Sequence, residues 1–147
     1  MIQRIQSLFL LLVILCLGAM FLTDIASIGD TILDVHGIQG ADVEPFLPFP
    51  ISGLVIGVIL LTAFVLFSFK NRKRQLMLGR LNYLLILTMV VLIFLSISDL
   101  QEKLENTDPN PYHLAAYLPI IALGFHLLAN RAIKRDEELV KSLDRLR

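Results

Sequence analysis

Cysteine is nearly absent from this sequence, since Cys16 is the only one among 147 residues. A single cysteine excludes an intrachain disulfide and a multi-cysteine zinc site. Cys16 follows a short basic start and an apolar stretch, which is also the setting of a lipid-modified cysteine. The residue before such a cysteine is normally small, however, whereas Leu15 stands here. We therefore interpret Cys16 as an apolar side chain within a helix.

Charge is absent from four long stretches, although 18% of the whole chain is charged. Residues 5–22, 49–69, 81–98 and 112–130 contain no Asp, Glu, Lys or Arg. Each stretch is close to the roughly 17–25 residues that a helix needs to cross a bilayer. Backbone polar groups in lipid must be satisfied within the segment, so helices are expected rather than strands. The sequence therefore predicts an all-α membrane protein with four transmembrane helices in an antiparallel bundle.

The first apolar stretch shares one property with a cleaved signal peptide, because Arg4 precedes it. The residues after it offer no good pair of small side chains at the spacing of a cleavage site. We therefore interpret residues 5–22 as the first helix of a single membrane domain that covers residues 1–147.

Basic residues lie almost entirely at one end of the predicted bundle. Of the 13 Lys and Arg residues, only Lys103 falls in a connection at the other end. The others are Arg4, Lys70, Arg72, Lys73, Arg74, Arg80, Arg131, Lys134, Arg135, Lys141, Arg145 and Arg147. Because Lys and Arg are concentrated in the cytoplasmic segments of membrane proteins, both termini are expected in the cytoplasm.

The two connections on the opposite side are acidic. They contain Asp24, Asp30, Asp34, Asp42 and Glu44 in the first and Asp99, Glu102, Glu105 and Asp108 in the second. Acidic residues contribute little to orientation, so the orientation rule does not explain them. One hypothesis is that these loops sense a cation outside the cytoplasm.

Two segments outside the apolar stretches have a readable local pattern. Residues 30–37 have strand character and Gly37 and Gly40 mark turns, which predicts a short β-hairpin over the bundle. Residues 131–147 continue the fourth helix as a charged cytoplasmic extension. Its narrow apolar stripe consists of Ile133, Val140, Leu143 and Leu146.

Small residues within the apolar stretches indicate where helices approach each other. Gly53 and Gly57 form a GxxxG pattern, which allows close helix contact. We favour packing within the molecule, and a dimerisation surface is the alternative. Gly124 predicts another close contact, and Pro119 is expected to kink the fourth helix.

Groups that could carry chemistry are few. His126 is the one titratable residue well inside an apolar stretch, and we interpret it as a neutral side chain hydrogen-bonded to another helix. His36 and His113 lie in or beside the outer connections, and neither has metal-binding spacing around it. The apolar stretches contain no acidic residue, and the sequence shows no protease constellation or Gly-rich phosphate loop. The sequence therefore predicts neither an enzyme nor a cofactor.

The basic segment between the second and third stretches has two explanations. Membrane orientation alone accounts for it, but such residues also bind anionic lipid head groups or an acidic protein partner. The candidate contacts are Lys70, Arg72, Lys73, Arg74, Arg80, Arg131, Lys134 and Arg135. No aromatic residue is interleaved with them, so no specific signal for nucleic acid is present.

Several segments together resemble a known family. They are Met1 to Gln6, Lys70 to Lys73 with Gln75, and Arg131 to Glu137 with Leu139, Val140, Ser142 and residues 144–147. The chain is similar to small four-helix inner-membrane proteins of the Bacteroidota, which form the domain of unknown function 4293 family. This resemblance implies a bacterial inner-membrane location and the same four-helix layout, and it implies no activity.

The function expected from the sequence is that of a non-enzymatic interaction protein, a scaffold or accessory subunit. It would bind a membrane or cytoplasmic protein, or a second copy of itself, through the basic segment and the charged extension, with the lipid bilayer as its surroundings. The alternative is a small transporter or channel component with a cavity around Pro119, Gly124 and His126.

Overall fold

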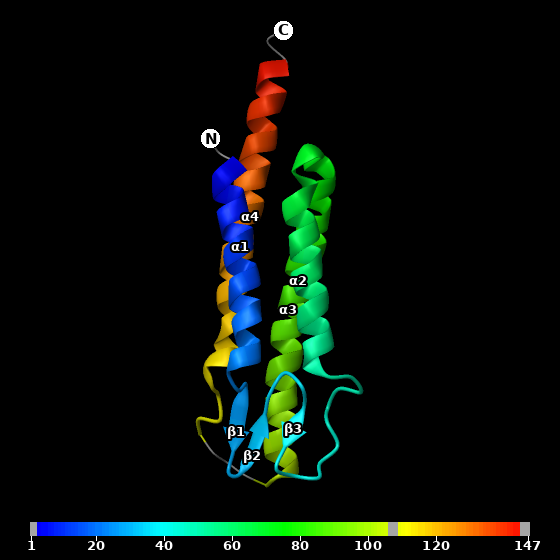
Figure 1. Cartoon of the computed structure of the whole chain (residues 1–147), viewed down its shortest axis with the longest axis vertical. Helices are drawn as coiled ribbons and strands as arrows, with labels where there is room; N and C mark the ends of the chain where they lie inside the picture. Colours follow the sequence, from blue (N-terminus) through cyan, green and yellow to red (C-terminus); the bar gives the residue numbers. More distant parts are fainter. Residues whose placement is uncertain (1–2, 106–108, 145–147) are drawn as a thin grey trace.

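The computed structural model describes residues 3–105 and 109–144, and side chains in 5–69, 71–105 and 109–140. Its elements are α1 (Gln3–Ala19), η1 (Met20–Leu22), β1 (Ala26–Ile28), β2 (Thr31–Leu33), β3 (Ile38–Gln39), α2 (Ile51–Phe67), η2 (Ser68–Lys70), α3 (Arg72–Lys103) and α4 (Leu114–Asp144) (Figure 1). Met1, Asp108, Arg145, Leu146 and Arg147 lie outside the described residues. So do the side chains of Arg4, Lys70, Lys141, Ser142, Leu143 and Asp144.

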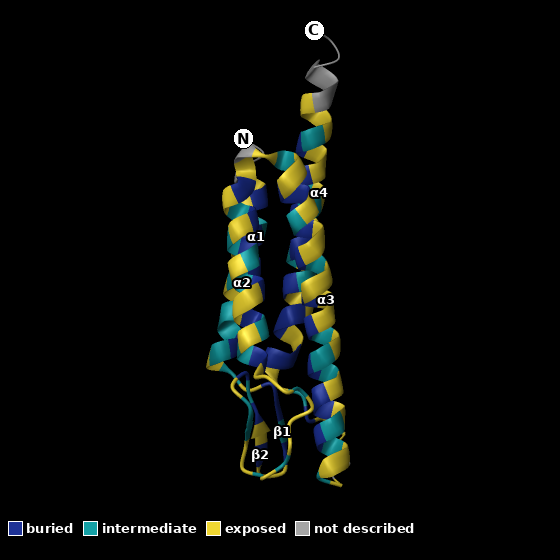
Figure 2. Cartoon of the chain, turned by 90° about the vertical axis from the view of Figure 1, so that its right-hand side faces the viewer, coloured by how far each residue is buried: buried dark blue, intermediate teal, exposed yellow. Residues whose placement is uncertain are grey.

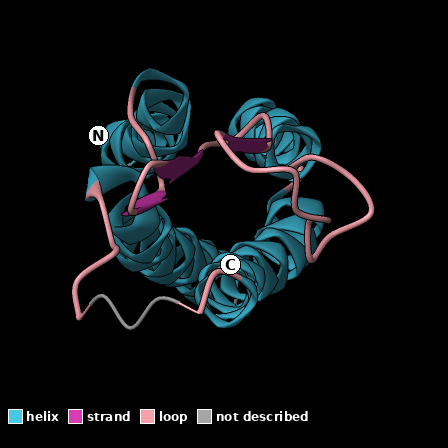
Figure 3. Ribbon diagram, turned by 90° about the horizontal axis from the view of Figure 1, so that it is seen from below, coloured by secondary structure: helices cyan, strands magenta, loops and turns pink. Residues whose placement is uncertain are grey.

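The four helices lie side by side and form what we call the helical body. α4 packs along α1 and α3, and α2 packs along the same two helices. Both chain ends and the α2–α3 connection lie at one end, which we call the basic end (Figure 1). The three strands lie at the other end, the capped end, and Figure 3 looks along the helices from that side.

Three helical segments are long and apolar enough to cross a membrane: Ile5–Leu22, α3 and Leu114–Val140. α2 is a shorter apolar helix of 17 residues. At 1.5 Å per residue it is about 25 Å long, compared with about 30 Å for a hydrocarbon core. It is followed directly by the three residues of η2. The structure is therefore mostly helical, with three segments of full membrane length and one shorter helix.

Exposed residues lie along the outward faces of the helices (Figure 2), and many of them are large and apolar. They include Leu8, Leu11, Leu15, Ile56, Leu60, Phe64, Leu81, Leu84, Leu87, Val91, Ile120, Ile121, Leu127 and Leu128. Soluble monomers rarely expose such large contiguous apolar surface. This surface is the kind that lipid covers.

The interior is also apolar, and its small side chains are concentrated on α4. α3 contributes Ile86, Met89, Ile93 and Ile97, which repeat at helical spacing and are buried. α4 contributes Ala115, Ala122 and Ala129, all fully buried. Small side chains let helix backbones approach closely. α4 can therefore contact α1 and α3 at the same time.

α3 is longer than the sequence predicted. It begins at Arg72 rather than residue 81 and ends at Lys103 rather than residue 98. Asn71 is the N-cap, and its side chain accepts a hydrogen bond from the Arg74 backbone N–H at 3.2 Å. The basic segment between the second and third apolar stretches is therefore mostly the first turns of α3. The helical extension of the fourth stretch is confirmed as far as Asp144, the last residue that the structure describes.

The hairpin expected over the bundle is present as β2 and β3, and β1 adds a third strand that the sequence did not predict. The sheet is antiparallel in the order β1-β2-β3. Gly40 has φ +96°, and a Cβ there would lie 2.6 Å from the Asp30 carbonyl oxygen. Only glycine fits this turn.

The second outer connection is joined to the sheet. The Ser27 N–H donates to the Pro111 carbonyl at 3.0 Å, and the His113 N–H donates to the Ile25 carbonyl at 2.9 Å. Buried Ile25, Ile28 and other cap residues continue the core of the helical body. The sheet therefore closes the end of the helical body.

Candidate functional site

Three helices meet around Asp136 at the basic end. This carboxylate is only 6% exposed and accepts a short hydrogen bond from the Gln6 side chain of α1. The Arg72 guanidinium of α3 donates to the Asp136 carbonyl at 2.9 Å. α4 is thus held by α1 and α3 close to the point where it leaves the helical body. We call these contacts the Asp136 junction.

A cavity of about 400 Å³ adjoins the Asp136 junction. Its polar lining comes from Gln6, Ser7, Arg72, Gln75 and Asp136, and Phe69 and Ile133 add apolar surface. The buried Gln75 side chain donates to the Val65 carbonyl at 3.1 Å and so connects α3 to α2. All four helices therefore contribute to polar contacts at this end.

Further into the helical body, polar side chains are organised around Gly79. The Gly79 carbonyl accepts hydrogen bonds from His126 Nε2 at 2.8 Å and from Asn130 Nδ2 at 3.3 Å. A Cβ at Gly79 would collide with the Asn130 side chain. Glycine at residue 79 therefore leaves the space that the Asn130 side chain occupies. The interpretation of His126 as a side chain bonded to another helix is confirmed.

A second buried contact joins α2 and α3. Asn82 Nδ2 donates to Thr62 Oγ1 at 2.8 Å, and Thr62 Oγ1 donates to the Val58 carbonyl at 2.7 Å. Among the described residues, Asn82 Oδ1, His126 Nδ1 and Asn130 Oδ1 are buried without a hydrogen-bond partner. Since the Gly79 carbonyl can only accept, Nε2 carries the proton of His126, and all three of these atoms are acceptors.

Sequence reasoning missed Gln6, Thr62, Gly79 and Asn82, because it searched the apolar stretches for charged groups. For Gln6, Thr62 and Asn82, the available signal was a neutral amide or a hydroxyl within an apolar stretch, whereas Gly79 lies just outside the third stretch and gave no such signal. Such groups hydrogen-bond between helices, since an apolar environment offers no alternative partner.

The predicted basic contacts separate into two groups. Lys73, Arg74 and Arg80 are exposed on the first turns of α3, and Arg131, Lys134 and Arg135 are exposed on α4. Arg72 is instead half-buried in the Asp136 junction. Arg74 lies over the Phe64 ring, 5.8 Å from its centre. Lys70 belongs to η2, but its side chain lies outside the described residues.

The glycines expected to mediate packing face outward. Gly53, Gly57 and Gly124 are exposed, and a Cβ at any of them would meet no atom within 4 Å. The preferred interpretation, packing within the molecule, is therefore wrong for these three residues, because the GxxxG spacing does not say which face of the helix it occupies. A contact with a second chain stays a prediction.

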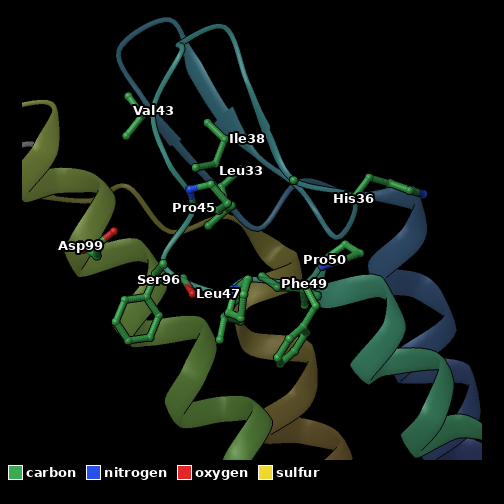
Figure 4. A pocket seen from close by; sticks show the side chains of 14 residues that line it. Leu33, His36, Ile38, Val43, Pro45, Leu47, Phe49, Pro50, Ser96 and Asp99 are labelled. Atoms are coloured by element: carbon green, nitrogen blue, oxygen red, sulfur yellow. The ribbon is translucent and has the colours of Figure 1, made fainter.

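A pocket at the capped end has a volume of about 400 Å³, and Figure 4 shows the side chains that line it. Leu33, Ile38, Val43 and Leu47 supply apolar lining from the sheet and the segment that follows it. Ser96 and Asp99 line it from α3, while His36 lies on the opposite side. The pocket is therefore mainly apolar with polar groups at its edges.

Lys103 holds the wall of this pocket in place. Its ammonium group lies 2.7 Å from Asp99 Oδ2 and donates to the Glu44 carbonyl at 2.9 Å. The segment after the sheet is thereby attached to α3. The one basic residue on the acidic side of the chain has a structural role.

The acidic cap residues are used in similar ways. Asp34 accepts from the backbone N–H groups of His36 and Gly37 at 2.7 and 2.8 Å, and from the Gln39 side chain at 2.7 Å. Across residues 3–105 and 109–144, no three His, Cys, Asp or Glu residues are grouped as a metal site would require. Cation sensing by these loops stays a prediction.

These features define a helical protein with apolar segments of membrane length, a β-sheet cap and a polar junction at the opposite end. The chain belongs to the family described as "Domain of unknown function (DUF4293)", which it matches over residues 2–146. No curated protein and no solved structure shows significant similarity to the chain.

Proposed function

We propose that this protein is a non-enzymatic scaffold or accessory subunit of the bacterial inner membrane. Four helices cross the bilayer, with both termini in the cytoplasm. α2 and η2 together cover residues 51–70, which supports a fourth crossing. The concentration of every Lys and Arg except Lys103 on one side of the predicted crossings supports the orientation.

The observation that carries the proposal is the extension of α4. This helix continues past the ends of α1, α2 and α3 as one unbroken element (Figure 1). It is held at the Asp136 junction, and the following residues Glu138, Leu139 and Val140 are exposed. Charged and apolar side chains thus lie together beyond the charge-free stretch of residues 112–130, as a protein-docking surface requires. The extension and the adjoining basic turns of α3 are the surface offered to a partner.

The test is to replace Leu139 and Val140 with Gln and to recover cross-linked partners from native membranes. We expect loss of partner recovery, because the apolar part of the docking surface is removed while every charge and the Asp136 junction are retained. The matched control replaces Ile32 and Phe46, exposed apolar residues of the capped end, with Gln. Recovery of the same partners from both variants would contradict the proposal.

The alternative, a small transporter or channel component, has less support. Its three residues do not line one cavity: His126 is bonded to α3, Gly124 faces outward and Pro119 is buried within α4. The buried acceptors Asn82 Oδ1, His126 Nδ1 and Asn130 Oδ1 are the polar groups that such a role would use.

A further inference from the structure

A groove runs between α1 and α4 on the outside of the helical body, close to the basic end. It encloses about 480 Å³. Ile5 and Phe9 of α1 and Leu128 of α4 supply its apolar part. Arg131, Lys134 and Arg135 of α4 supply its cationic part. The groove therefore combines an apolar wall with a cluster of positive charge.

The two parts are separated along the axis of α4. Arg131 lies three residues beyond Leu128 and Arg135 lies seven beyond it, which is about 4.5 and 10 Å at 1.5 Å per residue. Residues spaced by three and seven share one face of a helix. The interfacial layer of a leaflet is about 5–8 Å thick beyond the hydrocarbon. With Leu128 at the edge of the hydrocarbon, Arg131 lies at the depth of lipid phosphates. Arg135 lies just beyond that depth, and its long side chain can reach back to it because helix side chains tilt toward the N-terminus.

The apolar wall of the groove is fixed by a ring contact between α1 and α4 at the place where an acyl chain would lie. Phe9 and Phe125 stack across α1 and α4, with their ring centres 6.5 Å apart. Ile5 is one helical turn from Phe9, so the two form a continuous surface. Ile5 and Leu128 are 50% and 42% exposed, and both side chains are available to a ligand.

The cations of the groove are largely unneutralised. The one carboxylate in its lining, Glu138, lies 3.8 Å from the Lys134 ammonium, and both side chains are about two-thirds exposed. Among the described residues, Arg131 and Arg135 have no ion pair. The groove therefore carries a net positive charge beside an apolar wall, which is complementary to an anionic amphiphile.

We propose that this groove binds an anionic phospholipid of the cytoplasmic leaflet. The phosphate contacts Arg131 and Arg135, and an acyl chain lies along Ile5, Phe9 and Leu128. The leaflet assignment rests on the orientation given under the proposed function. A soluble anion or an acidic protein would leave the apolar wall uncovered, whereas a lipid uses both parts of the groove.

The test uses the full chain, purified in detergent and freed of lipid, with thermal unfolding followed during titration. Phosphatidylglycerol is compared with phosphatidylcholine of the same acyl chains, and inorganic phosphate forms a third arm. We expect phosphatidylglycerol to raise the unfolding temperature and the other two to have little effect, because only it satisfies both parts of the groove.

Two double variants with equal charge changes locate the site. R131Q/R135Q should weaken the apparent affinity for phosphatidylglycerol about thirtyfold, since each basic residue near an anionic surface contributes about one factor of five. K73Q/R80Q changes exposed cations of α3 that do not line the groove and should leave the affinity within about twofold of the wild type. All four substituted residues are exposed. The unfolding temperatures of the two double variants without lipid are the control for correct folding.

Three results would overturn the proposal: equal responses to the two lipids, equal losses in the two variants, or full stabilisation by inorganic phosphate. L128Q, which keeps every charge, should also lower the affinity for phosphatidylglycerol. No protein partner is present in this titration, so its failure is distinct from a failure of the partner-recovery experiment.

Discussion

The two ends of the molecule use charged side chains in different ways. At the capped end, Lys103 pairs with Asp99, and Asp34 accepts hydrogen bonds from the turn that follows it. At the basic end, Arg131 and Arg135 are exposed and have no ion pair among the described residues. Charge at the capped end therefore maintains the structure of the cap. Charge on α4 at the basic end is available to a ligand.

The ends also differ in how they are joined. The cap is held by backbone hydrogen bonds between strands and by apolar residues that continue the core. Toward the basic end, the helices are joined by partly or fully buried hydrogen bonds that side chains make. The Arg72 side chain donates to the Asp136 carbonyl, the His126 side chain to the Gly79 carbonyl, and the Asn82 side chain to Thr62. Single substitutions toward the basic end should therefore lower the free energy of unfolding more than substitutions at the capped end.

The largest effect is expected for Gly79→Leu. A side chain there would collide with Asn130 and separate α3 from α4, at a cost of about 3 kcal/mol for overpacking. Thermal or denaturant unfolding in detergent measures this loss. Gly124→Leu is the matched control, because Gly124 faces outward, and it should cause no loss, since the better helix propensity adds less than about 1 kcal/mol of stability. Equal losses would show that the close contact at Gly79 is not what joins the helices.

Asp136→Ala should have the next largest effect. It leaves the Gln6 side chain without its buried carboxylate partner, which costs about 2 kcal/mol. Glu138→Ala, two residues further on, removes only an exposed ion pair and should cost at most about 0.5 kcal/mol. Unfolding in detergent compares the two variants, and a loss for E138A that matched D136A would contradict the Asp136 junction.

A smaller effect is expected at the capped end for Lys103→Gln. The substitution removes the ion pair to Asp99 and weakens the attachment of the segment at Glu44, at a cost of about 1 kcal/mol. Hydrogen exchange in residues 41–50 should become faster while exchange in α4 stays unchanged. Glu102→Gln changes an exposed neighbour and is the control. An unchanged rate of hydrogen exchange in residues 41–50 would show that Lys103 does not hold this segment to α3.

The smallest effect is expected for Gly53→Leu and Gly57→Leu. Both residues face outward, so a leucine meets no protein atom and the better helix propensity adds less than about 1 kcal/mol of stability. Unfolding measurements should place both variants at or slightly above the wild type. A loss as large as that of G79L would show that these glycines pack inside the molecule.

The sequence predicted much of the helical architecture. The four apolar stretches correspond to α1 with η1, α2, α3 and α4, and the β-hairpin and the extension of α4 are confirmed. These features follow from the distribution of apolar and turn-forming residues, which acts locally. The start of α3 was placed nine residues too late, because hydrophobicity marks the part of a helix in lipid and not its continuation into water.

The sequence was less informative about which glycine makes the close contact. Gly53 and Gly57 have the recognised spacing and face outward, whereas Gly79 stands alone and touches Asn130. The spacing of glycines along one helix does not show which side chain of the neighbouring helix lies opposite them. The same reason hides the Asp136 junction, whose partners Gln6 and Arg72 are 130 and 64 residues away in the sequence.

The unbroken course of α4 has a mechanical consequence. Its 31 residues make a rod about 46 Å long at 1.5 Å per residue. The residue just before it, His113, is tied to the sheet through Ile25, and its far end projects beyond the other helices. A tilt of one degree about the sheet displaces the far end by about 0.8 Å, as the length of the rod requires. α4 thus connects the sheet to the basic end as one rod, and the Asp136 junction holds it close to the end that such a tilt would displace most.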